Sequence, residues 1–384
     1  MIFPAWESDV VRFSGRFSLM SMMVAMRNRA LLVAVCSCCA IGNAASPRWQ
    51  ATPQLPQVTE RVDVPRVVLD VHVLAGNGSA VRGLGPADFR VFVDGRAVDI
   101  ERAEWVTEAV ADRHPPVGAA SPAPHAESRD DARFGLPSGR QIVLLIQRDL
   151  EPSRFQGLVT MLHRMQGFID GLTPDDRVAV VSFQSHLDLW CDYTTDRTTL
   201  ASILDKQLIM ASPPAAVPVS STVSLASYFD RDAGRRAATM EEALVVIGHA
   251  LDKLPGAKSV VFFGFGLGRW SGGAGGSHLF VADEYADARR LLTRARAAVF
   301  SVDITDADEH TLESGLRLVA ADTGGFFVRT NDWPGLAMNH IAGSLAGRYE
   351  IAFVRPDRPR GEHAVRVELV GQAGTVLVRP SYRD

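Results

Sequence analysis

The sequence predicts a doubly wound α/β domain with a mostly parallel, Rossmann-type sheet. A small β module, built from strands near the two ends of the chain, accompanies it. Continuous apolar runs such as Ile142–Ile146 and Ser259–Phe263 alternate with amphipathic helical segments, which is the pattern of buried parallel strands and their crossover helices. Towards both ends, shorter segments alternate apolar and polar residues, and this period of two indicates strands with one exposed face.

The first part of the chain has the layout of a secretory signal peptide. A short apolar run, Ala30–Ile41, follows two arginines and leads into small residues that end at Ala45. This is the order of the charged, apolar and cleavage regions of a signal. The run is too short to cross a hydrocarbon core of about 30 Å comfortably. We therefore expect residues 1–45 to be removed on export, with Met26 as a second candidate for the true start.

The cysteines bear on localisation. Cys36, Cys38 and Cys39 lie inside the apolar run, and only Cys191 lies in the body of the protein, which excludes an intrachain disulfide framework. We expect an exported protein, periplasmic or extracellular, whose mature chain has no integral membrane span. Lipoprotein processing at Cys38 or Cys39 is the alternative, and it would anchor the protein to a membrane.

The N-terminal β module is expected over residues 58–108. Alternating apolar and polar residues predict its strands, and glycine-containing turns separate them. The segment that follows, 109–139, is rich in Pro, Ala and Ser and shows no period, so it is expected to be a flexible linker. The expected strands are Val62–Leu74, Phe89–Val93 and Val98–Val106, with turns at Gly76–Gly78 and Asp94–Gly95.

The α/β domain is expected over residues 140–346. Thr239 opens its third helix, where Glu242 completes a capping box, and Met210–Ala238 is expected to be an insertion. The expected strands are Ile142–Ile146, Val178–Phe183, Leu187–Cys191, Ser259–Phe263, Ala298–Val302 and Phe326–Arg329. The expected helices are Phe155–Leu172, Thr198–Leu208, Thr239–Leu254, Glu284–Ala297, Glu309–Ala321 and Trp333–Leu345.

Three further strands are expected within residues 347–384. They have the same alternating texture as the N-terminal module, so we expect strands from both ends to pack into one β unit. The three segments are Tyr349–Val354, Ala364–Val370 and Thr375–Val378.

This order of elements resembles the von Willebrand factor type A domain. The chain also resembles the bacterial VWFA-related proteins first named from acidobacteria. In that family a "gL..DF.v..DG" segment precedes the domain, an "A..TGG" segment lies late in it, and a Tyr-led strand closes it. The matching residues here are Val81–Leu84, Asp88–Phe89, Asp94–Gly95, Ala320–Gly325 and Tyr349.

The resemblance implies a place for a metal ion. In the family, Mg²⁺ is held by a D-x-S-x-S motif after the first strand, a Thr before the third helix and an Asp after the fourth strand, all hard oxygen ligands. Here the first motif reads Gln-Arg-Asp-Leu-Glu over Gln147–Glu151, and Phe265 replaces the late Asp. Both aspartates are missing and Arg148 repels a cation, so we expect a degenerate metal-ion-dependent adhesion site that holds no metal. The alternative is a cation retained by Asp149, Glu151 and Thr239.

A glycine-rich segment, Gly264–Ser277, follows the fourth strand of the α/β domain and is expected to be a pliable surface loop. It fails as a nucleotide site because Arg269 stands where the third glycine of G-x-G-x-x-G belongs. Loops at the carboxyl ends of parallel strands form the usual binding edge of such sheets. We therefore expect a binding surface, here called the carboxyl-edge surface, formed by Gln147, Arg148, Asp149, Glu151, Thr239, Phe265, Arg269 and Trp270.

Composition and motifs narrow the function. Lys+Arg 40 against Asp+Glu 44 gives a net charge of −4, which provides no electrostatic case for nucleic acid. The sequence contains no G-x-S-x-G elbow, no H-E-x-x-H and no paired-cysteine metal spacing. We expect a protein without enzymatic activity or cofactor that binds another protein or an envelope macromolecule. A hydrolase with an unrecognised site is the alternative from a different class.

Overall fold

The computed structural model describes residues 65–107, 139–219, 223–273, 276–306, 310–330 and 334–384. Val62–Asp384 form one compact unit, separate from Met1–Arg61. The predicted signal peptide and nearly all of the predicted linker lie outside the described residues, and the predicted segment boundaries stay predictions. None of the helices in the described part of the chain combines the length and the apolar character that a membrane crossing requires.

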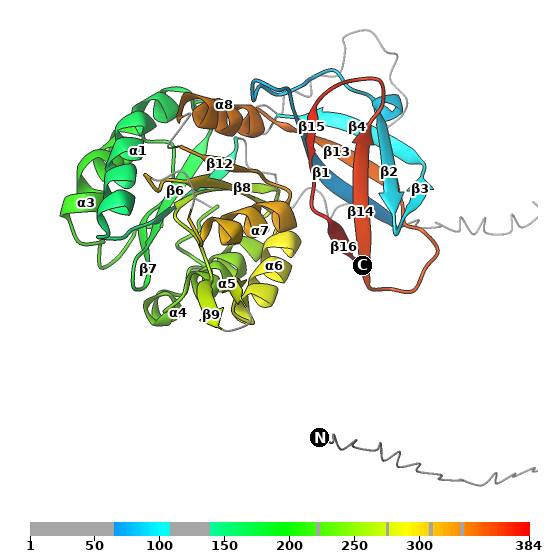
Figure 1. The fold of residues 1–384 in the computed structure, drawn as a ribbon. Coiled ribbons are helices and arrows are strands. Elements are labelled where there is room, and N and C mark those ends of the chain that lie inside the picture. Colours follow the sequence, from blue (N-terminus) through cyan, green and yellow to red (C-terminus); the bar gives the residue numbers. More distant parts are fainter. Residues whose placement is uncertain (1–64, 108–138, 220–222, 274–275, 307–309, 331–333) are drawn as a thin grey trace, which may run out of the picture. The chain divides into compact units, whose positions relative to one another are not determined.

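A six-stranded sheet with the order β12-β11-β8-β5-β6-β7 forms the centre of the α/β domain (Figure 1). All its neighbouring strands run parallel except β7, which pairs antiparallel with β6. The predicted doubly wound, mostly parallel sheet is therefore confirmed. The strands are β5 (Gln141–Gln147), β6 (Arg177–Phe183), β7 (Leu187–Thr194), β8 (Lys258–Gly264), β11 (Ala297–Asp303) and β12 (Phe327–Arg329).

Helices cover both faces of this sheet. One hydrophobic core joins the sheet to α5 (Met240–Asp252), α6 (Glu284–Arg294) and α7 (Glu313–Thr323). A second core lies on the opposite face. It contains residues of α1 (Pro152–Asp170), α2 (Arg197–Ser202), the π-helical turn Ile203–Gln207, α3 (Leu208–Met210) and α8 (Pro334–Leu345). The apolar residues of α1 recur every three or four positions, which gives that helix the buried stripe it needs to pack.

Two four-stranded antiparallel sheets form the β module, with the orders β15-β1-β13-β4 and β16-β14-β2-β3. Their inner faces share one core that includes Leu69, Val91 and Ile351. Strands from both ends of the chain thus form one β unit, as predicted. The strands are β1 (Arg66–Leu74), β2 (Phe89–Val93), β3 (Arg96–Val98), β4 (Ile100–Val106), β13 (Arg348–Val354), β14 (Glu362–Leu369), β15 (Thr375–Leu377) and β16 (Ser381–Arg383).

The structure corrects some expected elements. The glycine-rich segment is not simply a loop, because β9 (Arg269–Gly273) pairs antiparallel with β10 (Gly276–Phe280) as a hairpin. The hairpin is formed by backbone pairing. Its sequence lacks the alternation of apolar and polar side chains from which a strand is predicted. The predicted insertion contains the short helix α4 (Arg231–Arg236). The predicted strand Val98–Val106 is divided between β3 and β4, which belong to different sheets.

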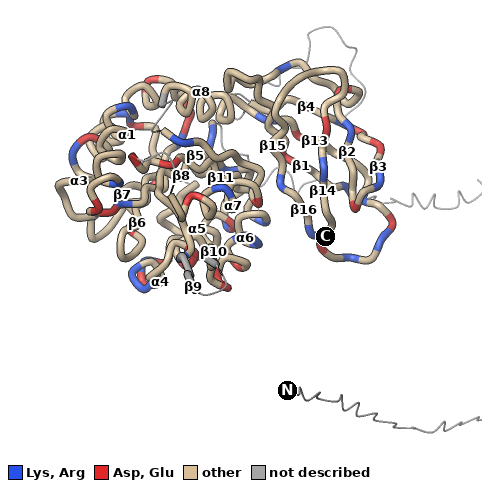
Figure 2. Tube along the Cα trace, in the orientation of Figure 1, with Lys and Arg blue, Asp and Glu red and all other residues tan. Residues whose placement is uncertain are grey.

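Ion pairs join the β module to the segment that follows α6. The Nε of Arg296 donates to Asp70 Oδ2 at 2.8 Å, and the Nε of Arg348 donates to Asp70 Oδ1 at 2.6 Å. Burial alone would raise the pKa of Asp70, but the hydrogen bonds and charges of the two guanidinium groups hold that pKa well below its usual value. Elsewhere, basic and acidic residues are interspersed along the described elements (Figure 2).

Candidate functional site

Gln147, the last residue of β5, lies at the base of the carboxyl-edge surface. Its side chain is buried, and its Oε1 accepts hydrogen bonds from the backbone amides of Phe265 at 3.0 Å and Gly266 at 3.1 Å. A Cβ on Gly264 would come within 2.7 Å of the same oxygen. Gln147 therefore fixes the segment after β8 against the end of β5, and its amide oxygen is already bound to the protein itself.

Asp149 and Glu151 lie at the start of α1, and both are engaged with Arg154. The Arg154 guanidinium forms an ion pair with Asp149, and Glu151 caps the helix by accepting from the Arg154 backbone amide at 3.1 Å. The same guanidinium lies 4.1 Å from the centre of the Phe265 ring. Burial alone would raise the pKa of Asp149, but the hydrogen bonds from Arg154 and from the backbone amides of Leu150 and Glu151, together with the charge of Arg154, lower that pKa.

Thr239 is the N-cap of α5. Its Oγ1 accepts from the backbone amide of Glu242 at 3.2 Å, and the Glu242 carboxylate accepts from the backbone amide of Ala238 at 2.6 Å. The first bond is the N-cap half of the predicted capping box, whereas the Glu242 carboxylate binds the amide of Ala238 and not that of Thr239. Asp149, Glu151 and Thr239 thus use their oxygens for an ion pair and for two helix caps.

Arg148 is one of two arginines of this surface that form no ion pair with a carboxylate among the described residues. Its guanidinium is half-buried and lies 5.9 Å from the centre of the Trp190 ring, and it forms no ion pair with the residues that the structure describes. Burial lowers the pKa of Arg148, and the charge of Asp188 partly offsets this. The Trp190 indole is itself fixed, because its Nε1 donates to Ser182 Oγ at 2.8 Å.

Arg269, the second arginine predicted for this surface, is the first residue of β9. Its exposed guanidinium lies 4.8 Å from the centre of the Phe280 ring, which is 40% exposed. Trp270 is placed opposite Leu279 in the hairpin register, and its side chain lies outside the described part of the structure. Two arginines of this surface are therefore supported by aromatic rings rather than by carboxylates.

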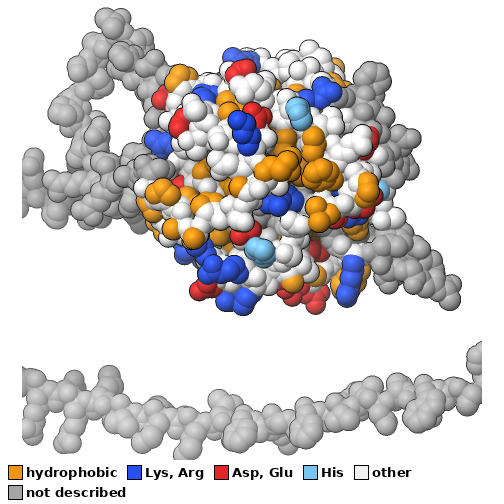
Figure 3. Space-filling model, turned by 90° about the vertical axis from the view of Figure 1, so that its left-hand side faces the viewer, with side chains coloured by type: hydrophobic (Ala, Val, Ile, Leu, Met, Phe, Trp, Pro, Cys, Tyr) orange, Lys and Arg blue, Asp and Glu red, His pale blue; other side chains and the backbone are white. Residues whose placement is uncertain are grey.

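Apolar side chains accompany these arginines. Leu150, which follows Arg148 and Asp149 in the chain, is 77% exposed, and Phe155 in the first turns of α1 is 37% exposed. Figure 3 shows one face of the molecule, without residue labels, on which hydrophobic side chains lie next to basic ones. Such a mixture of apolar and cationic groups is typical of surfaces that bind other proteins.

Sequence reasoning missed a cluster after β11. Asp303, His310 and Glu313 offer ligand atoms that lie within 4.8 Å of one another, and His310 Nε2 is 2.7 Å from Asp303 Oδ2. Both carboxylate oxygens of Glu313 already accept hydrogen bonds from the guanidinium groups of Arg317 and Arg329. Two adjacent cations disfavour a metal ion, so this cluster is better explained as an ion-pair network. No spacing in the sequence indicates this cluster, because Asp303 ends β11 whereas Glu313 begins α7, and the two meet only in the fold.

Tyr349, which leads the closing strand, has a structural role. Its buried hydroxyl donates to the carbonyl of Val81 at 3.0 Å and accepts from the backbone amide of Leu84 at 3.1 Å. Its ring makes edge contacts with Phe89 and Trp105. The Val81–Leu84 segment of the resemblance is thus attached to β13 by one side chain.

The other motif residues also stabilise turns and close packing. Asp94 Oδ1 accepts from the backbone amide of Ala364 at 2.9 Å, which connects the β2–β3 turn to β14. Thr323 Oγ1 accepts from the backbone amide of Val299 at 3.0 Å. A Cβ on Gly325 would lie 1.9 Å from the Val299 carbonyl oxygen, so only glycine permits this approach. The residues of these motifs therefore stabilise the fold, and their contacts do not indicate a binding site.

The α/β domain has the fold that the resemblance to the von Willebrand factor type A domain implies, a doubly wound and mostly parallel sheet with helices on both faces. Its main elements follow the order that the sequence predicts, with one antiparallel strand at the edge of the sheet. That order is β5-α1-β6-β7-α2-α5-β8-α6-β11-α7-β12-α8. No protein-family model matches the chain, and no curated protein matches its sequence.

Several solved structures are similar to this chain. BatB from Bacteroides thetaiotaomicron is 14% identical, with 54% of this chain and 97% of that chain covered and a TM-score of 0.34. A von Willebrand factor type A protein from Catenulispora acidiphila is 12% identical, with 83% and 72% covered and a TM-score of 0.36. The manganese-loaded TRAP protein of Plasmodium vivax is 12% identical, with 65% and 95% covered and a TM-score of 0.35. At these identities the likeness concerns the fold alone.

Proposed function

We propose that this protein is a non-catalytic binding module, which recognises another protein or an envelope macromolecule through the carboxyl-edge surface without a metal ion. One observation carries the proposal. Arg148 presents a half-buried guanidinium without a carboxylate partner among the described residues, at the edge where loops follow the parallel strands. A guanidinium that forms no ion pair at such an edge favours an anionic partner group.

The chemistry of the neighbouring residues supports binding without a metal. A cation at Asp149, Glu151 and Thr239 would have to displace the Arg154 ion pair and compete with two helix caps. It would also lie beside Arg148, whose charge repels it. The cost of these rearrangements makes the retained-cation alternative the weaker explanation.

The partner chemistry that fits this surface is a carboxylate flanked by apolar groups. A guanidinium matches a carboxylate through two parallel hydrogen bonds, and an aromatic ring behind it limits its freedom before binding. Arg148 on Trp190 and Arg269 on Phe280 both have this arrangement. Leu150 adds exposed apolar area next to Arg148, so an acidic, partly apolar segment of a partner protein is the favoured ligand.

We further propose that the protein is exported, because of the signal-like segment that ends at Ala45. N-terminal sequencing of the protein from its native cells tests this point. A chain beginning at Ser46 outside the cytoplasm supports export, whereas a lipid-modified Cys38 or Cys39 replaces it with membrane anchoring.

A capture experiment tests the binding proposal. The chain from Ser46 to Asp384 is immobilised and exposed to envelope extract, and the affinity of the captured protein is then measured. Arg148→Ala should weaken binding by about 2 kcal/mol, roughly thirtyfold, if the residue is a hot spot. Arg177→Ala is the matched control, since Arg177 is also half-buried but begins β6 at the opposite edge of the sheet.

The other outcomes separate the alternatives. Loss of affinity on chelation of divalent ions would favour the retained cation, and turnover in a panel of hydrolase substrates would favour an enzyme. Unchanged affinity in Arg148→Ala, Arg269→Ala and Trp270→Ala, with loss on substitution in the β module, would move the interaction surface to that module.

A further inference from the structure

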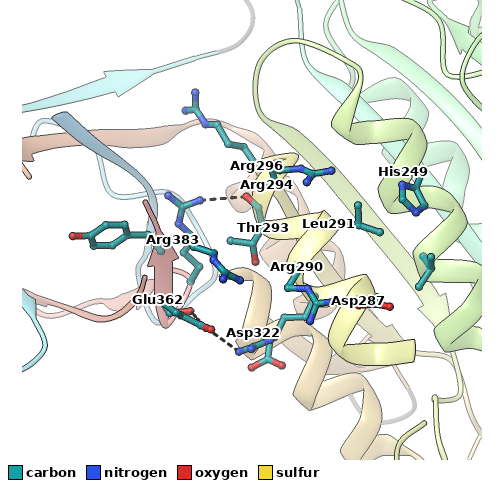
Figure 4. Close-up of a pocket in the computed structure, with 15 residues that line it drawn as sticks. His249, Asp287, Arg290, Leu291, Thr293, Arg294, Arg296, Asp322, Glu362 and Arg383 are labelled. Atoms are coloured by element: carbon teal, nitrogen blue, oxygen red, sulfur yellow. Dashed lines mark hydrogen bonds and ion pairs between the residues drawn. The ribbon is translucent and has the colours of Figure 1, made fainter. Parts of the chain in front are cut away.

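A pocket of about 840 Å³ lies away from the carboxyl-edge surface, between α5, α6 and the terminal strands (Figure 4). Arg296, which lines it, directly precedes β11. The pocket is therefore near the amino end of that parallel strand, whereas the carboxyl-edge surface is at the opposite end. Six arginines line the pocket: Arg289, Arg290, Arg294, Arg296, Arg379 and Arg383.

Four of these arginines are paired with carboxylates. Their charges are compensated within the protein, so they shape the wall of the pocket without requiring a ligand. The pairs are Arg294 with Asp252 at 2.6 Å, Arg296 with Asp70 at 2.5 Å, Arg289 with Glu362 at 3.4 Å, and Arg290 with Asp287.

Arg379 and Arg383 are different. The Arg379 guanidinium donates to two backbone carbonyls, those of Thr293 at 3.3 Å and Val68 at 3.0 Å, and its Nε is buried without a hydrogen-bond partner. Arg383 is exposed and reaches from β16 towards α6 (Figure 4). Neither forms an ion pair with the described residues.

A largely buried guanidinium that is bound only to neutral acceptors is costly. Transfer of the charge out of water is not repaid by backbone carbonyls as fully as by an anion. Burial accordingly lowers the pKa of Arg379, and the charge of Asp70 offsets only part of this effect. An anion that enters the pocket beside Arg379 and Arg383 would relieve this cost.

We propose that this pocket binds a ligand that carries a phosphate group. A tetrahedral phosphate accepts hydrogen bonds from more than one guanidinium group, and Arg379 and Arg383 both line this pocket, whereas a planar carboxylate is satisfied by one guanidinium. The pocket is much larger than one phosphate, and Leu291 and Val245 contribute apolar lining. An organic phosphate therefore fits better than the free ion.

One acidic group restricts where the phosphate binds. Asp322 lines the pocket, and its Oδ2 accepts from the Tyr285 hydroxyl at 2.8 Å. Its negative charge repels an anion, so the phosphate is assigned to the side of Arg379 and Arg383, and the organic part of the ligand to the side of α6. This inference is independent of the function proposed for the carboxyl-edge surface.

Calorimetric titration of the chain from Ser46 to Asp384 tests the proposal with four probes. They are inorganic phosphate, glycerol 3-phosphate, citrate, and vesicles of phosphatidylcholine with or without phosphatidic acid. We expect binding of glycerol 3-phosphate or of the phosphatidic acid vesicles, and the stronger of the two identifies a soluble ester or a lipid headgroup as the source. Equal or tighter binding of citrate would overturn the phosphate assignment.

Variants distinguish phosphate binding in this pocket from unspecific attraction of phosphate to surface arginines. Arg383→Ala removes an exposed side chain and should weaken phosphate binding at least tenfold with an unchanged melting temperature. Arg96→Ala, an exposed arginine of β3 outside the pocket, should bind as the unaltered chain does. Arg379→Lys keeps the charge but loses the planar guanidinium, and it should also weaken binding. Absence of binding by every phosphate probe at millimolar concentration, or equal binding in Arg383→Ala and Arg96→Ala, would overturn the proposal.

Discussion

Arg148 and Arg154 lie close together in the chain but have opposite electrostatic surroundings. Arg154 is neutralised by Asp149 and lies on Phe265, whereas Arg148 lies on Trp190 without a carboxylate partner among the described residues. The sequence indicates that Arg148 would repel a metal ion. It does not indicate the pairing of Arg154, because that contact depends on how the first turn of α1 meets the segment after β8.

Magnesium should have little effect on stability. An ion that binds only the folded state at a hundredfold excess over its dissociation constant would stabilise it by about 2.7 kcal/mol. Because Asp149, Glu151 and Thr239 are engaged within the protein, millimolar Mg²⁺ should leave the melting temperature unchanged in thermal denaturation.

The control for this measurement is a second aspartate. A rise in melting temperature that disappears in Asp149→Ala but persists in Asp205→Ala, which alters an exposed aspartate of the π-helical turn, would restore the retained-cation alternative.

At the scale of elements, periodic segments were predictable and short or glycine-rich ones were not. β2 occupies the predicted residues Phe89–Val93, and the turn after it has positive φ at Asp94 and Gly95, as an Asp-Gly turn requires. The β9–β10 hairpin contains too many glycines to show a side-chain period. The three residues of β16 are too few to define one, and its pairing with β14 depends on chain segments that meet only in the fold.

Tyr349→Phe should destabilise the β module. The substitution keeps the ring contacts but removes the hydroxyl that bonds Val81 and Leu84. It leaves a buried amide and a carbonyl unsatisfied, so the free energy of unfolding should fall by about 1–3 kcal/mol in urea denaturation. Tyr228→Phe is the control, because Tyr228 is 50% exposed. Equal stability of the two variants would show that water replaces the Tyr349 hydroxyl.

At the scale of the whole molecule, contacts between distant segments join the β module to the α/β domain. Asp70 and Arg296 are 226 residues apart, and the His72 ring meets the edge of Phe300 at a centroid distance of 5.4 Å. A local sequence pattern carries no information about such pairs. The two folded parts were therefore predictable separately, whereas the contacts between them were not.

The stability of the unit should decrease below neutral pH because of His72. Burial, aided by the charge of Arg348, lowers the pKa of His72 to about 4 from a usual value of 6.5. Above pH 6.5 the His72 side chain is neutral in both the folded and the unfolded protein. Between pH 6.5 and pH 4, His72 is protonated in the unfolded chain but stays neutral in the folded protein. The free energy of unfolding should therefore fall by about 3 kcal/mol over this pH range.

Urea denaturation at several pH values between 7.5 and 4.5 measures this loss. His72→Gln should flatten the pH dependence, and His163→Gln, which alters an exposed histidine of α1, should not. The same slope in all three chains would mean that His72 makes no contribution to it.

The strand pairing of β4 with β13 has a consequence for how the chain folds. Val106 and Arg348 are partners in this ladder, so the entire α/β domain lies between two paired residues. If that domain were unfolded, closing a loop of roughly 240 residues would cost on the order of 5 kcal/mol in chain entropy. Once the domain has folded, its first and last residues are held close together, as the hydrogen bond from Arg140 Nη1 to the Leu345 carbonyl shows. The loop left to close then shortens to roughly 30 residues, which lowers the entropy cost by about 2 kcal/mol. We therefore expect that unfolding of the larger domain would destabilise the β module through chain connectivity, in addition to any contact that is lost.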